Sequence, residues 1–134
     1  MDRRRLLTAP PHRTVASAAK LMAKRNAGAV MVLAERRLVG IFTERDVVFR
    51  VVAAGLDADA TCLAQVMTPN PRTIGPEDAL GSALLIMHKH GFRHLPVLEH
   101  GRIVGVVSAR SAMDPDLEEF AVEASRREQF MRSI

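Results

Sequence analysis

The sequence of 134 residues contains no tryptophan, no tyrosine and only five phenylalanines. Proteins that bind single-stranded nucleic acid commonly stack the bases on aromatic side chains, and this chain is poorly supplied for that role. The one cysteine, Cys62, cannot form a disulfide within the chain and lacks the neighbouring ligands of a zinc site. We therefore expect a protein of the reducing cytoplasm that requires no metal or cofactor.

Long apolar runs are also missing. Apolar runs such as Val104–Val107 and Leu84–Met87 fall far short of the roughly 20 residues that a transmembrane helix needs. The N-terminal "MDRRRLLTAPP" has charges but no apolar stretch typical of a secretory signal. The sequence offers no convincing pairing of nucleophile and base, no glycine-rich phosphate loop and no carboxylate pair placed for acid–base catalysis. These absences favour a binding module over an enzyme.

The composition is that of a folded domain, with 48% hydrophobic and 25% charged residues and a net charge of +4. A positive balance indicates an anionic partner, either nucleic acid or a phosphorylated small molecule. Arginines gather at the two ends, at Arg3–Arg5 and at Arg126, Arg127 and Arg132. Solvated termini explain these clusters, and a nucleic-acid patch is the alternative.

The chain contains an internal duplication. When Thr8 is placed on Thr73, Thr8–Asp46 aligns with Thr73–Ser111 without a gap, and 12 of the 39 positions are identical. Average composition would give about two or three identities. The identical residues of the first copy are Thr8, Pro11, Ser17, Ala18, Met22, Lys24, Val32, Leu33, Arg37, Val39, Gly40 and Arg45.

Each copy predicts the element order β-α-β-β-α. The first helix of each copy is amphipathic, because its apolar residues recur at i, i+3, i+4 and i+7. These residues are Val15, Ala18, Ala19 and Met22 in the first copy, and Leu80, Ala83, Leu84 and Met87 in the second. The strands are expected at Leu6–Ala9, Ala29–Ala34 and Arg37–Phe42, and at Arg72–Ile74, His94–Leu98 and Arg102–Val107. A second helix is expected from Thr43 to a C-cap at Gly55.

One such repeat leaves a sheet face uncovered, so we expect an α+β fold in which the two repeats pack as a pseudo-twofold pair. Within a single module of residues 1–134, the expected parts are repeat one at 6–54, a linker at 55–70, repeat two at 71–113 and a C-terminal helix at 114–132. Asp114 and Pro115 are typical of a helix start. The apolar stripe of this helix either packs on the core or contacts a second copy or partner; it consists of Leu117, Phe120, Ala121 and Ala124.

Thr43 and Asp46, in the segment "TERD", have the spacing of a capping box. That purely structural interpretation explains both residues and is favoured by the spacing alone. The functional alternative uses the same geometry. The free amides at a helix N-terminus attract phosphate, a hydroxyl there can donate to it, and a carboxylate one turn later can accept from a ribose diol.

The surroundings of this segment favour the functional alternative. "LVGIFTERD" recurs as "IVGVVSARS", and the second copy contains "GFRHLPV" at Gly91–Val97. With these motifs in register, the chain resembles the CBS (cystathionine-β-synthase) domain family, whose repeats pair into Bateman modules, from about Leu6 to Ala112. The resemblance implies a stand-alone regulatory or sensor module. It would bind an adenosine-containing ligand, such as AMP, ADP, ATP, S-adenosylmethionine or NAD, in the cleft between the repeats, signal to an unknown effector protein and form a homodimer.

The resemblance also implies which residues form the main site. Asp46 would hold the ribose hydroxyls, Thr43 the phosphate, and the basic side chains of Arg93 and His94 could meet the phosphate. Backbone groups of Ile74 and Leu95 would read adenine, with Phe92 lining the pocket. The full set is Thr43, Arg45, Asp46, Thr73, Ile74, Phe92, Arg93, His94 and Leu95.

A second, symmetric site departs from the family pattern. Ser111 replaces the ribose-binding carboxylate and cannot accept two hydroxyls as Asp does. The stretch "AGAVMV" supplies no basic side chain where the second copy has Arg93 and His94. We therefore expect one competent site and one weakened or empty site. The residues of the second site are Thr8, Ala9, Gly28, Ala29, Val30, Ser108 and Ser111.

Other interpretations stay open. His88, His90 and His94 lie close in sequence, but Gly91 interrupts the helix between them, which favours exposed histidines over a metal site. Two further functions compete with ligand sensing. One is a ligand-independent dimeric adaptor with vestigial clefts, and the other is a nucleic-acid binder whose affinity falls steeply with salt.

Overall fold

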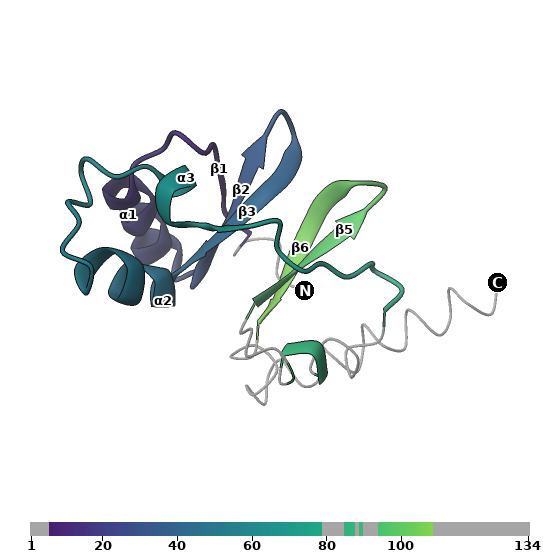
Figure 1. The fold of residues 1–134 in the computed structure, drawn as a ribbon. Helices are drawn as coiled ribbons and strands as arrows, with labels where there is room; N and C mark the ends of the chain where they lie inside the picture. Colours follow the sequence, from purple (N-terminus) through teal and green to yellow (C-terminus); the bar gives the residue numbers. More distant parts are fainter. Residues whose placement is uncertain (1–5, 79–84, 88, 90–93, 109–134) are drawn as a thin grey trace. The chain divides into compact units, whose positions relative to one another are not determined.

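The computed structural model describes residues 6–78, 85–87, 89 and 94–108 (Figure 1). The described residues form two compact units that meet in sequence at Pro71 and Arg72. We call them the first unit and the second unit. In the part of the chain that is described, no helix is long and apolar enough to cross a membrane.

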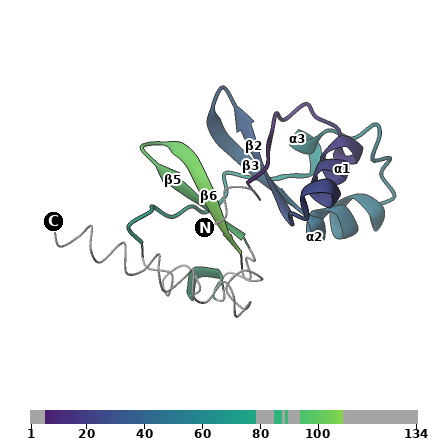
Figure 2. The same cartoon turned by 180° about the vertical axis from the view of Figure 1, so that it is seen from behind.

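The first unit is built on a four-stranded sheet of order β1-β2-β3-β4. Strand β1 runs parallel to β2, and the β2–β3 and β3–β4 pairs are antiparallel. Its helices gather at one end, and the β2–β3 hairpin extends away from them (Figures 1 and 2). The strands are β1 (Thr8–Ala9), β2 (Ala29–Ala34), β3 (Arg37–Thr43) and β4 (Thr68–Pro69), and the helices are α1 (Val15–Arg25), α2 (Glu44–Asp46), η2 (Val47–Val52) and α3 (Leu63–Val66).

Helix α1 provides the crossover that two parallel strands require. The Thr14 hydroxyl accepts a hydrogen bond from the Ser17 N–H at 3.2 Å, which caps the first turn. Asn26 ends the helix in the left-handed conformation, with a φ of +50°. Three of the four residues of the predicted apolar stripe are buried, and Ala19 is half-buried. The buried three are Val15, Ala18 and Met22.

The core of the first unit contains side chains from both its strands and its helices. Phe42, in β3, is fully buried and is the largest side chain in this core. Burial of such side chains is the main source of folding free energy. The cluster consists of Leu7, Ala9, Val15, Ala18, Met22, Val30, Val32, Phe42, Val51, Leu63 and Val66.

Residues 57–71, which we call the connector, return to the start of α1. The Val15 N–H donates to the Thr61 carbonyl at 2.9 Å, and the Leu63 N–H donates to the Arg13 carbonyl at 2.9 Å. Leu63 and Val66 of α3 are buried in the core. The connector therefore adds both backbone hydrogen bonds and apolar contacts to the first unit.

The second helix of the first repeat extends as predicted, but its hydrogen bonds are of the π type over Val47–Val52. The Ala53 N–H, for example, donates to the Val48 carbonyl five residues earlier, at 2.8 Å. Gly55 has a φ of +72°, which agrees with its predicted role at the helix end.

The second unit repeats the strand pairing of the first at the positions that the duplication predicts. Its hairpin of β5 (His94–Glu99) and β6 (Arg102–Ser108) places His94 opposite Ser108, as β2 and β3 place Ala29 opposite Thr43. All six pairs correspond, and so does the register shift at Val32/Leu33 and Val97/Leu98. The parallel bridge between Ile74 and Val97 matches the pair Ala9 and Val32. The duplication is therefore confirmed at the level of individual strand pairs.

Parts of the second repeat lie outside the described residues. These include three residues of the predicted helical stripe, Leu80, Ala83 and Leu84, and the predicted C-terminal helix at 114–132, which follows the repeat, also lies outside them. The fourth, Met87, is helical and buried. Together the described elements give the α+β fold that the sequence predicts.

The two hairpin turns have the same backbone conformation, but only the second has a glycine at a position with positive φ. Both have two-residue loops with positive φ, at Glu35 (+51°) and Arg36 (+69°), and at His100 (+52°) and Gly101 (+78°). Such turns favour glycine, because a side chain is strained in the left-handed region. The "AERR" segment thus forms a tight hairpin despite its weak turn sequence.

We expect Arg36→Gly to raise the free energy of unfolding by about 0.5–1 kcal/mol, since relief of strain exceeds the added freedom of the unfolded chain. Urea denaturation measures the change. The reciprocal variant Gly101→Arg is the matched control and should lower stability by a similar amount. A destabilised Arg36→Gly protein would contradict this account of the turn.

Candidate functional site

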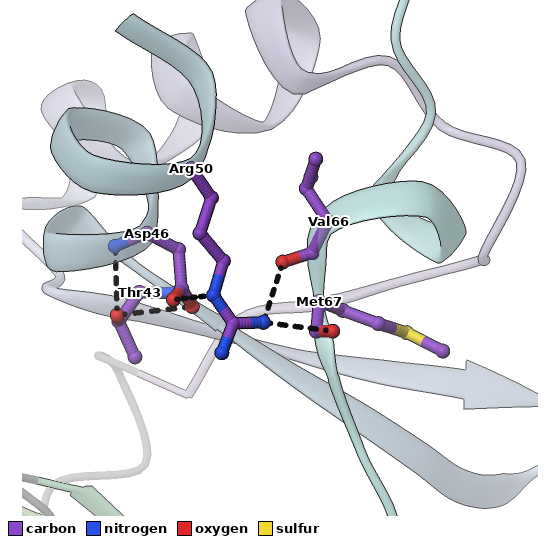
Figure 3. Close-up of polar contacts among 5 residues, drawn as sticks. All are labelled: Thr43, Asp46, Arg50, Val66 and Met67. Carbon is purple, nitrogen blue, oxygen red and sulfur yellow. Dashed lines mark hydrogen bonds and ion pairs between the residues drawn. The ribbon is translucent and has the colours of Figure 1, made fainter. Parts of the chain in front are cut away.

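Thr43 and Asp46 form a capping box at the end of β3 (Figure 3). The Asp46 N–H donates to Thr43 Oγ1 at 3.2 Å, and the Thr43 N–H donates to Asp46 Oδ2 at 2.9 Å. The Thr43 hydroxyl also donates to Asp46 Oδ2, at 3.1 Å. The structural interpretation of "TERD" is therefore confirmed, and Asp46 is buried, with 9% of its surface exposed.

Arg50 completes this cluster and is not among the residues predicted from the sequence. Its Nε lies 3.4 Å from Asp46 Oδ1, and its Nη1 donates to the Val66 and Met67 carbonyls at 3.2 and 3.3 Å. Figure 3 shows the guanidinium between the carboxylate and the two carbonyls. The i, i+4 spacing of Asp46 and Arg50 on one helix was the available signal.

Residues predicted for both sites lie together in the first unit. The Glu44 N–H donates to the Gly28 carbonyl at 3.0 Å, and Ala29 is the strand partner of Thr43. The first residue of β2 therefore lies beside the start of the helix that carries Asp46. Arg45 is exposed, and its guanidinium carbon lies 5.1 Å from the centre of the Phe49 ring.

The other first-unit residues of the predicted second site belong to the sheet. Thr8 is exposed in β1, whereas Ala9 and Val30 are buried. Ser108 is half-buried at the end of β6. Ser111 lies outside the described residues.

The remaining residues predicted for the main site belong to the second unit. Thr73 is exposed, His94 is half-buried and Leu95 is fully buried. The Ile74 N–H donates to the Pro96 carbonyl at 3.0 Å, and the Ile74 carbonyl accepts from the Leu98 N–H at 2.8 Å. These bonds join Ile74 to strand β5.

Two predicted members of the main site, Phe92 and Arg93, lie outside the described residues, as do His88 and His90. Among the residues that the structure does describe, no three His, Cys, Asp or Glu side chains come together as a metal site would require.

The glycine of the repeated motif has a packing role. A Cβ atom at Gly40 would lie 2.9 Å from Cγ and 3.0 Å from Cε of Met67, and closer still to its sulfur. Gly40 therefore lets the Met67 side chain cross the strand. In this way the connector approaches the site closely enough for its carbonyls to reach Arg50.

The chain is similar in sequence to known proteins. The family model described as "CBS domain" matches residues 1–53 and 63–115. The CBS domain-containing protein CBSCBSPB5 of Arabidopsis thaliana is 40% identical over 95 residues, which cover 70% of this chain and 17% of that protein. The chain thus spans about a sixth of the length of that relative.

Solved structures give the same result. One of a putative signal-transduction protein with CBS domains from Burkholderia ambifaria MC40-6 is 31% identical, with a TM-score of 0.78, and the match covers 90% of this chain and 85% of that one. The CBS domain protein PAE2072 from Pyrobaculum aerophilum, solved in complex with AMP, is 26% identical, with a TM-score of 0.77 and coverage of 92% and 95%.

Proposed function

Because the chain belongs to the CBS domain family, with one match to each repeat, we propose that it is a regulatory module that binds an adenosine-containing ligand between its repeats and signals to a partner protein. The observation that carries this proposal is the Thr43–Asp46 pair, whose hydroxyl and carboxylate lie together at a helix start. The AMP complex of the similar Pyrobaculum protein supports the ligand class. The role is binding rather than catalysis.

The pair has the chemistry that a nucleoside phosphate needs. A carboxylate offers about four lone pairs, and Asp46 Oδ2 uses two of its own on the Thr43 N–H and hydroxyl. If the Thr43 hydroxyl turns to donate to a phosphate, Oδ2 regains one lone pair for a ribose hydroxyl. The second ribose hydroxyl would donate to Oδ1. The cap can therefore accept a ligand while its backbone hydrogen bonds stay in place.

In the complete site, the second repeat would supply Thr73, Ile74, Phe92, Arg93, His94 and Leu95. The second site, with Ser111 in place of a carboxylate, would bind weakly or not at all.

The test is a thermal-shift panel on the full chain with AMP, ADP, ATP, NAD and S-adenosylmethionine. A ligand present at 100 times its Kd adds about 2.7 kcal/mol to the free energy of unfolding, which raises Tm clearly. We expect a shift with one or two members of the panel. No shift with any of them would favour the ligand-independent adaptor, and binding that weakens steeply with salt would favour a nucleic-acid partner.

We also propose a homodimer in the cytoplasm. Four exposed apolar side chains of η2 and the turn after it support the dimer, because a surface of this kind is commonly covered by another chain. They are Val48, Phe49, Val52 and Leu56. The unpaired thiol of Cys62 is consistent with a reducing compartment. Light scattering measures the oligomeric state.

A further inference from the structure

We propose that Arg50 is the positioning residue of the ribose site: its guanidinium, fixed by the connector, holds the Asp46 carboxylate in the orientation that accepts the ribose hydroxyls. This inference rests on the proposed function, because it assigns how that site is kept in shape. Arg50 itself need not touch the ligand.

The two oxygens of the Asp46 carboxylate are held in different ways. Oδ2 accepts from the Thr43 N–H and hydroxyl at 2.9 and 3.1 Å, so the cap fixes that oxygen. Oδ1 faces Arg50 Nε at 3.4 Å, which is an ion pair longer than a tight charged hydrogen bond. Oδ1 is therefore oriented by Arg50 and still able to accept from a ligand.

The guanidinium has its own support on the opposite side. Its Nη1 donates to the carbonyls of Val66 and Met67, which lie at the C-terminal end of α3. Carbonyls at a helix end lack partners within the helix and attract cations. Three contacts in one planar group thus fix a side chain that is otherwise 49% exposed.

Burial makes this support necessary. The side chain of Asp46 is only 12% exposed, and a carboxylate with so little water needs a partner of opposite charge. Without Arg50, Oδ1 would lose the positive charge that faces it, and small rotations about the Cβ–Cγ bond would loosen the orientation shown in Figure 3. The cap hydrogen bonds to Oδ2 would remain. The hydrogen bond that weakens would therefore be the one that Oδ1 accepts from a ribose hydroxyl.

The inference is tested by ribose discrimination rather than by affinity alone. The Kd values of AMP and ATP, and of their 2′-deoxy counterparts, are measured by calorimetry on wild type, Arg50→Gln and Arg50→Lys. A hydrogen bond to a charged group makes a difference of about tenfold or more, so wild type should prefer the ribonucleotides by that factor. We expect Arg50→Gln to reduce this preference at least about fivefold while the 2′-deoxy affinities change less than about twofold.

Arg50→Lys keeps the charge but not the planar fork, and it should retain an intermediate preference. Arg25→Gln, an exposed arginine in the last turn of α1, is the matched control and should leave the preference unchanged. If Arg50→Gln does not fold, as judged by its thermal transition, Arg50→Lys carries the test alone.

The outcomes separate the two proposals. A wild-type protein that binds these nucleotides, with a ribose preference that survives in both Arg50 variants, overturns the role of Arg50 and leaves the proposed function intact. An equal loss of affinity for ribose and deoxyribose forms would assign Arg50 a general structural role and would also overturn the inference. A wild type that binds none of the four nucleotides overturns the nucleotide site and the inference together.

Discussion

Asp46→Ala is expected to weaken the binding of an adenosine ligand by about two orders of magnitude, because in the proposed site Asp46 is the acceptor of both ribose hydroxyls. Each hydrogen bond to a charged acceptor is worth about 1.5–3 kcal/mol, and a factor of ten in Kd corresponds to about 1.4 kcal/mol. The same change removes the side chain that accepts from the Thr43 N–H, which should lower stability by about 1 kcal/mol. Ligand titration and urea denaturation measure the two effects separately.

Thr14→Ala is the matched control for the loss of a cap. Thr14 caps α1 through the Ser17 N–H and is not among the residues predicted for either site. Its loss should also lower stability by about 1 kcal/mol but leave the ligand-induced rise in Tm intact. If Asp46→Ala behaves like Thr14→Ala in both measurements, Asp46 is a cap and nothing more.

The largest loss of stability is expected from Phe42→Ala, at about 3–5 kcal/mol. Phe42 is fully buried in the core of the first unit, so truncation leaves a cavity as well as losing apolar contact. Whole domains are stable by only about 5–15 kcal/mol, and this single change therefore removes much of the margin. It should also disturb Thr43, the next residue in β3. The midpoint of urea denaturation, followed by circular dichroism, reports the loss.

Val107 occupies the position in the second unit that Phe42 occupies in the first, since both lie in the same strand pair of their hairpins. It is smaller and only half-buried. Val107→Ala should therefore cost about 1 kcal/mol. If Phe42→Ala also costs only about 1 kcal/mol, the core of the first unit does not depend on Phe42.

The sequence allowed the repeated architecture to be predicted because periodicity reflects forces that act locally. Apolar runs placed β2 and β3 within a residue of their observed bounds. The helical spacing of apolar residues identified α1, and the alignment of the two copies predicted the matching hairpins. The capping box at Thr43 was also readable, because both of its partners lie within one helical turn.

Features that depend on distant parts of the chain were not readable. Arg50 is held by backbone carbonyls 16 and 17 residues away in the connector. Every residue has such a carbonyl, so the amino-acid sequence does not indicate which carbonyls bind Arg50. The π-type hydrogen bonds of Val47–Val52 were not predicted either. Gly40 could be recognised as a motif residue, but the reason for it, the Met67 side chain, lies in the connector.

The return of the connector to α1 has a consequence for the protein during its synthesis. Arg13 and Leu63 share a backbone hydrogen bond although they lie far apart in the sequence. At the usual rate of translation, roughly 2.5–10 seconds pass between the addition of the first of these residues and that of the second. Throughout that interval Leu63 and Val66 are missing from the core of the nascent first unit. The core of the first unit is therefore completed only after the connector has been synthesised.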